Sequence, residues 1–173
     1  MPCSSSVPEP RLVDRSGCSA PTAWRGFSII GRACLLLAII LGTGALPLRG
    51  AVMISEFLAS NDGGLRDDDG DESDWIEIFN SGPTEVSLAG WSLSDNSGTK
   101  AKWVFPAVAL PPNGFLVVWA SGKDRRNPAA PLHTNFSLGR TGGYLGLFDQ
   151  AGTSVTEYAS YPEQYENRPY GVR

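Results

Sequence analysis

The sequence predicts an antiparallel β-sandwich or barrel after Ala51, on the strength of three observations. The apolar segments there are short, rich in β-branched and aromatic residues, and separated at close spacing by Gly, Pro, Asn and Asp. No window after Ala51 sustains a 3.6-residue hydrophobic period with helix caps. All three cysteines lie within residues 1–50, so the remainder has to be stabilised by its hydrophobic core without a disulfide or a thiolate metal site.

The predicted strands follow from this punctuation. The clearest is Phe115–Ala120, and in Trp75–Phe79 the alternation of a strand places Ile76 and Ile78 together on one face. The segment Asp149–Gly152 is typical of a hairpin turn. The other predicted strands are Val52–Ala59, Glu85–Leu88, Trp91–Ser94, Lys102–Phe105, Val108–Leu110, Tyr144–Phe148 and Ser154–Tyr158. The aromatic residues expected to fill the space between the sheets are Trp91, Trp103, Phe105 and Trp119.

Residues 1–50 are interpreted as a leader that directs secretion. The unbroken apolar run Ala33–Leu41 follows Arg32 and has the length of a signal-peptide core, which is short for a membrane span. Small residues in Thr43–Ala45 favour cleavage near Ala45. An uncleaved anchor, which would be the chain's one link to a membrane, and a buried helix are the two alternatives. The predicted mature domain is then 51–173.

Charge divides the chain at the same place. Residues 1–50 carry five basic and two acidic residues, a net charge of +3, whereas the rest carries nine basic and sixteen acidic residues, a net charge of −7. A negative domain repels polyanions, which disfavours nucleic acid as a partner. The short basic cluster Lys123–Arg126 is interpreted as a solvated loop.

Several motifs in order resemble the lamin tail domain family, and in particular its secreted bacterial members. The resemblance covers about residues 52–173 and implies an immunoglobulin-like antiparallel β-sandwich. No heptad rod precedes the domain, so filament assembly and a nuclear location are not implied. The motifs are Ile54–Asn61, Asp74–Asn80, Gly90–Leu93, Trp103–Pro106, Leu110–Gly114, Val117–Gly122 and Glu157–Tyr165.

The search for catalytic residues yields none. His133 is the only histidine, so a paired-histidine metal site is excluded, and the sequence has no G-x-S-x-G elbow that would position a nucleophilic serine. His133 is therefore expected to be an ordinary loop residue. The glycines between 139 and 146 precede a predicted strand, whereas a phosphate-binding loop precedes a helix. We predict a non-catalytic domain without a bound cofactor.

One acidic segment between two predicted strands favours calcium. Asp67, Asp69, Asp71 and Asp74 alternate in a pattern whose oxygens can converge on a hard cation, and Gly70 permits the tight turn that convergence needs. A full EF-hand is excluded because the twelfth position of the loop is an isoleucine. The alternative is a solvated acidic loop.

Together these observations predict a secreted, non-catalytic binding or targeting module, with a protein or a polysaccharide as the open choices of partner. The resemblance implies a second hypothesis, because bacterial lamin tail domains commonly form one module of longer extracellular proteins. In that case the chain is the accessory domain of an extracellular enzyme, such as a hydrolase, a nuclease or a spore-coat-kinase-like protein. A free-standing enzyme with paired carboxylates is disfavoured, because the acids concentrate in one loop.

Overall fold

The computed structural model of the protein describes residues 52–172, so the predicted leader 1–50 and its cleavage near Ala45 lie outside the described residues. Every regular element in the described part is a β-strand, and none of its segments is a helix that could span a membrane. The strands are β1 (Val52–Leu58), β2 (Asp74–Asn80), β3 (Val86–Ser87), β4 (Ser92–Ser94), β5 (Trp103–Val104), β6 (Ala109–Leu110), β7 (Phe115–Ala120), β8 (Leu132–His133), β9 (Gly143–Phe148), β10 (Ser154–Tyr161) and β11 (Tyr170–Gly171).

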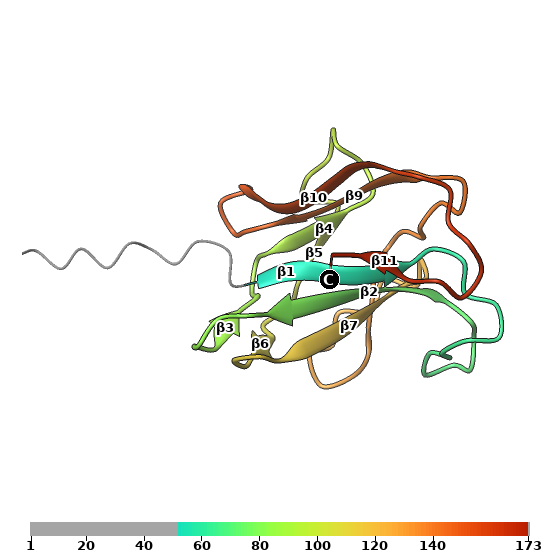
Figure 1. Cartoon of the computed structure of the whole chain (residues 1–173). Coiled ribbons are helices and arrows are strands. Elements are labelled where there is room, and N and C mark those ends of the chain that lie inside the picture. Colours follow the sequence, from blue (N-terminus) through green and yellow to red (C-terminus); the bar gives the residue numbers. More distant parts are fainter. Residues whose placement is uncertain (1–51, 173) are drawn as a thin grey trace, which may run out of the picture. The chain divides into compact units, whose positions relative to one another are not determined.

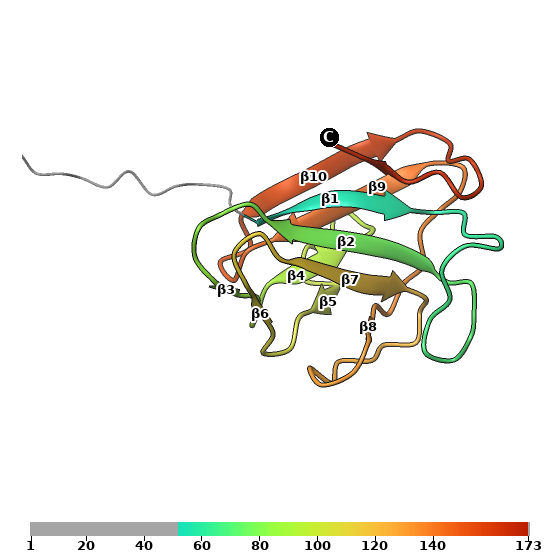
Figure 2. The ribbon, with the colours of Figure 1, turned by 60° about the horizontal axis from the view of Figure 1, so that its bottom comes forward.

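Two sheets form the layers of this domain (Figure 1, Figure 2). The first has the strand order β11-β1-β2-β7-β8 and the second β10-β9-β4-β5, while β3 and β6 form a separate two-stranded ribbon. All pairs are antiparallel except β7 with β8, which is parallel. The predicted antiparallel β-sandwich is confirmed.

Alternation along β2 and β7 explains which side chains form the core. Ile76 and Ile78 are fully buried in the main core, as the strand period predicts. Their neighbours point to the other face of the first sheet, where Phe79 stacks on Phe115 at a centroid distance of 4.4 Å. The second sheet contributes, among others, Leu93, Trp103, Leu145 and Leu147 to the same core.

The aromatic residues expected between the sheets divide into two groups. Trp103 and Phe105 lie in the main core, and Trp91 packs against it while partly buried. Trp119 lies instead in a smaller cluster with Leu58 and Trp75 on the outer face of the first sheet. This part of the prediction was wrong because Val118 points into the core, so the next residue of β7 points away from it.

The sequence did not predict β8 and β11, because each strand has only two residues and so shows no alternation. β11 is held very close to β1: a Cβ added to Gly171 would lie 2.0 Å from the backbone oxygen of Ser55. Only glycine fits at this point of the pairing.

The open side between β1 and β10 is bridged by side chains. The backbone N–H of Ile54 donates to Oγ1 of Thr156 at 3.2 Å, and the hydroxyl of Tyr158 donates to the backbone oxygen of Ile54 at 3.4 Å. The backbone N–H and C=O of Ile54 are therefore both hydrogen-bonded by side chains of β10 in the opposite sheet rather than by the backbone of a neighbouring strand.

Candidate functional site

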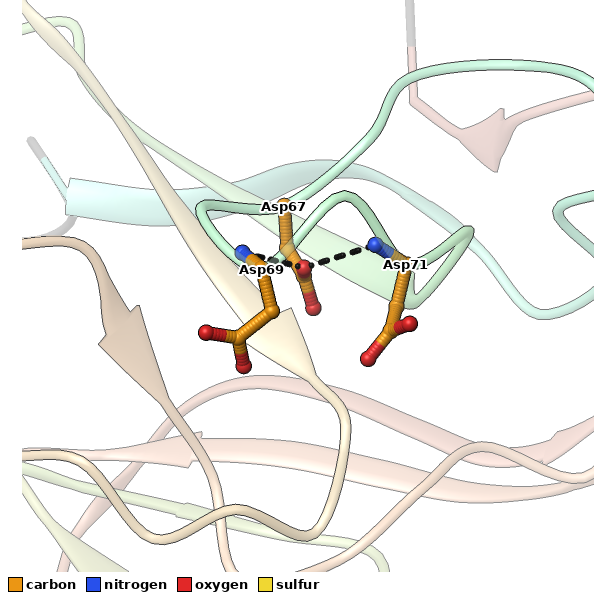
Figure 3. Close-up of side chains that lie close together, drawn as sticks. All are labelled: Asp67, Asp69 and Asp71. Atoms are coloured by element: carbon orange, nitrogen blue, oxygen red, sulfur yellow. Dashed lines mark hydrogen bonds between the residues drawn. The ribbon is translucent and has the colours of Figure 1, made fainter.

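The acidic loop, residues 67–73, is the last part of the connection between β1 and β2 and is organised around Asp67 (Figure 3). Asp67 is buried, and its Oδ1 accepts hydrogen bonds from the backbone N–H groups of Asp69 and Asp71, each at 3.0 Å. Its Oδ2 accepts from the hydroxyl of Ser73 at 2.7 Å. Gly70 has a φ of +84° and provides the predicted tight turn. The acidic loop is thus a folded turn rather than an extended segment.

A cation from the chain itself lies among these carboxylates. The ammonium nitrogen Nζ of Lys123, in the loop after β7, is 2.6 Å from Asp67, 2.7 Å from Asp69 and 2.9 Å from Asp71. Figure 3 shows the three aspartate side chains leaving the acidic loop toward the same side. Mutual repulsion among the three carboxylates is therefore offset within the fold.

The protonation of this cluster follows from its contacts. Burial alone would raise the pKa of Asp67, but hydrogen bonds from Lys123, Ser73 and two backbone N–H groups outweigh it and hold that pKa well below its usual range. For Lys123, desolvation acts to lower the pKa, but hydrogen bonds to the three carboxylates raise it above its usual value. Both groups are charged over the whole physiological range of pH.

Arg125 adds a second positive group to the acidic loop. Its guanidinium lies 2.9 Å from the carboxylate of Asp68 and makes two hydrogen bonds to Asp69, at 2.6 and 3.2 Å. The hydrogen bonds from Arg125 are the largest cause of a lowered pKa at Asp69. The two-point contact fixes the orientation of Asp69 as well as its charge.

His133 lies in β8 and is fully buried, so the prediction of an ordinary loop residue was wrong. Its Nε2 is 2.7 Å from a carboxylate oxygen of Asp68, and its Nδ1 is 2.8 Å from the hydroxyl of Ser121. Because a carboxylate oxygen only accepts, Nε2 is the donor to Asp68, and Nδ1 makes the second hydrogen bond of the ring with the hydroxyl of Ser121. The ring also stacks on Trp119 at a centroid distance of 6.5 Å.

The chain Ser121–His133–Asp68 contains the residue types of a hydrolytic triad in a different arrangement. In the serine protease triad, Nε2 faces the serine and Nδ1 faces the aspartate, which is the reverse of the geometry here. Ser121 also accepts a hydrogen bond from the backbone N–H of Lys123 at 3.3 Å. These hydrogen bonds connect the acidic loop to β8 and to the residue that follows β7.

Asp74, the fourth predicted calcium ligand, lies apart from the other three. It begins β2, and its carboxylate accepts a hydrogen bond from the backbone N–H of Asn61 at 3.3 Å. Burial raises the pKa of Asp74 to about 6, against the lowering effect of that hydrogen bond and one from the backbone of Leu138. Among the described residues, the group close enough to share one ion is Asp67, Asp69 and Asp71. Calcium binding stays a prediction, and the ion would have to displace Lys123.

The basic cluster Lys123–Arg126 was interpreted as a solvated loop, and its role was missed. Lys123 and Arg125 bind the acidic loop, whereas Arg126 pairs with Asp124 at 2.7 Å and lies over the ring of Trp103 at 5.8 Å. The available signal was the opposite charge of two loops more than fifty residues apart, which cannot by itself show that they meet.

The fold and this site can be set beside known proteins. A family description, Lamin Tail Domain, matches residues 47–162. The chain belongs to the lamin tail domain family. Lamin tail domains have an immunoglobulin-like fold and form a non-catalytic family, which agrees with the resemblance found in the sequence. A comparison with curated proteins found no match.

This lamin tail domain has a second candidate site on the segment between β10 and β11. A hollow of about 260 Å³ is lined by residues 162–165 and 168–170. Tyr165 is 68% exposed and Tyr170 is 38% exposed, so two aromatic rings of the lining are accessible to a ligand. All but the first lining residue lie beyond the family match. The hollow is thus a feature of this chain outside the matched part of the family.

Proposed function

We propose that this lamin tail domain is a non-catalytic binding or targeting module that acts outside the cell. The observation that carries the proposal is the hollow after β10, because exposed aromatic rings on a preformed surface are typical of binding sites. A partner that covers Tyr165 and Tyr170 accounts for their exposure.

Contacts within the fold support two of the lining residues, Tyr170 and Gln164. The ring of Tyr170 contacts Phe57 and Tyr158 at centroid distances of 5.6 and 5.9 Å. The buried side chain of Gln164 donates to the backbone oxygen of Pro162 at 2.6 Å. A ligand that binds here meets a surface already folded, so little ordering of the loop opposes binding.

The extracellular part of the proposal is supported by the sequence alone. The apolar run Ala33–Leu41 and the small residues before Ala45 are those of a cleaved signal peptide, and a domain without cysteines after residue 51 needs no disulfide to fold after export.

Two measurements test this function. The full-length chain is expressed in a secreting bacterial host, where we expect export and an N-terminus near residue 46 on sequencing. The exported protein is then sedimented with purified bacterial cell-envelope material, and Tyr165→Ala is compared with Phe115→Ala. Phe115 is the matched control because it is a similarly exposed aromatic residue, 60% exposed, on the outer face of the first sheet. Full-length protein confined to the cytosol, or equal sedimentation of both variants, would contradict the proposal.

A further inference from the structure

We propose that the hollow between β10 and β11 binds an uncharged glycan, with a sugar ring lying against Tyr165 and Tyr170. This inference rests on the proposed function and names the class of ligand. It follows from three properties of the hollow: its aromatic floor, its polar rim and its balance of charge.

The floor is formed by two tyrosines with different supports. The guanidinium of Arg168 lies over the ring of Tyr165 at 5.7 Å, a contact that orients the ring, and Tyr165 remains 68% exposed. Tyr170 is fixed from beneath by Phe57 and Tyr158. Sugar rings present C–H groups on their faces, and these groups pack on aromatic rings as other apolar groups do.

The rim carries hydrogen-bonding groups that the fold leaves available. Within residues 52–172, Glu163 makes no ion pair with a cationic side chain, and Arg168 makes none with a carboxylate. Arg168 offers donors only, and the carboxylate of Glu163 offers acceptors only. A ligand that satisfies both has to accept and donate at its edge, as sugar hydroxyls do. A polyproline segment presents backbone carbonyls, which accept but do not donate, so it offers no donor to the carboxylate of Glu163.

Charge selects an uncharged ligand over an ionic one. Glu163 and Arg168 are the charged residues of the lining, and their charges cancel. The chain after residue 50 has a net charge of −7, which repels a polyanion at long range. A neutral glycan is not repelled by the net negative charge of the domain, and it adds no charge to a lining whose own two charges cancel.

The experiment titrates the full-length purified chain with hexasaccharides of glucose, xylose, mannose and N-acetylglucosamine, each β-1,4-linked, by isothermal calorimetry. Polygalacturonate and decaproline are titrated as the charged and the peptide alternatives. We expect saturable binding of at least one neutral hexasaccharide, unchanged from low to physiological salt. Tyr165→Ala should weaken it at least tenfold and Glu163→Gln severalfold, whereas Phe115→Ala should leave it unchanged.

Each other outcome overturns the inference. These outcomes are saturation by none of the four hexasaccharides, binding of polygalacturonate or decaproline alone, and equal loss in Tyr165→Ala and Phe115→Ala. A urea midpoint equal to that of the wild type shows that Tyr165→Ala is folded, as the exposure of this side chain predicts. Tyr165-dependent sedimentation with envelope material together with no binding of neutral sugars would retain the binding-module function and remove only the glycan. Loss of both removes the function itself.

Discussion

Replacing Lys123 by methionine removes the cation from the acidic loop and keeps most of the side-chain volume. The buried Asp67 loses one charge-assisted hydrogen bond, a change of about 1.5–3 kcal/mol, whereas the contacts to the solvent-exposed Asp69 and Asp71 are screened by water and add little. We therefore expect Lys123→Met to lower the free energy of unfolding by about 1.5–3 kcal/mol at neutral pH.

Urea unfolding followed by tryptophan fluorescence measures this difference. Lys100→Met is the matched control, because Lys100 is exposed and its ammonium contacts only the backbone oxygen of Gly152, at 3.3 Å, and the ring of Phe148. That control should change stability by less than about 0.5 kcal/mol. A loss below about 0.5 kcal/mol in Lys123→Met as well would refute the role of Lys123 as the internal counter-ion.

The same variant tests calcium. In Lys123→Met the three carboxylates no longer have a competing ammonium, so an ion that binds with a dissociation constant of about 0.5 mM, as in extracellular modules, would raise stability by about 1.4 kcal/mol at about 5 mM calcium. The rise should be smaller in the wild type, where calcium has to displace Lys123. If calcium shifts the unfolding of neither protein, the acidic loop is not a calcium site, and Lys123 and Arg125 neutralise its carboxylates.

The remaining predictions concern pH and the core. The raised pKa of Asp74, about 6, means that its folded form binds more protons than the unfolded chain between about pH 4 and 6, so its contribution to stability falls as pH rises through this window. Asp74→Asn should remove this decrease in the free energy of unfolding with pH. At pH 7 the variant should be more stable than the wild type by about 1 kcal/mol, a value that allows for solvent screening. A pH profile of stability that is unchanged in the variant would contradict the raised pKa. Asp67 has the opposite sign: its lowered pKa adds stability above about pH 4 that is lost on acidification, and Lys123→Met should flatten this acid limb of the urea-midpoint profile. Trp103→Ala should cost about 3–5 kcal/mol because Trp103 is fully buried, and Trp91→Ala clearly less; equal losses in urea unfolding would show that Trp91 is also a full member of the core.

Much of the fold could be predicted from the sequence because apolar and polar residues tend to alternate along a strand that has one buried face. Ile76 and Ile78 share the core face that alternation assigns to them, and the long strands β1, β2, β7, β9 and β10 stand where apolar segments meet turn residues. Alternation alone does not show which face of a strand packs in the core, and Trp119 was therefore assigned to the core although it lies on the outer face of the first sheet. A two-residue strand such as β11 has no period at all.

The candidate sites were harder to predict because they depend on contacts between distant segments. Of the four predicted ligands, the oxygens of Asp67, Asp69 and Asp71 lie close together and Asp74 lies apart, and nothing in the spacing of these residues names Lys123 as the cation among them. Calcium binding stays a prediction. His133 was dismissed because a lone histidine has no local pattern, and its partners Ser121 and Asp68 come from different loops. Exposure of Tyr165 is likewise a property of the folded surface alone.

The side-chain bridge between β1 and β10 has a consequence for how the protein meets other chains. An unpaired strand edge is a template for addition of a foreign strand, and such edges lead to domain swapping and aggregation. At Ile54 the donor and acceptor that a foreign strand would need are already bonded to Thr156 and Tyr158. Addition of a strand at this seam has to break both bonds first. The exposed aromatic rings after β10 therefore lie in a domain whose β1 backbone is already hydrogen-bonded at Ile54, which favours contact through side chains over addition of a strand at this residue.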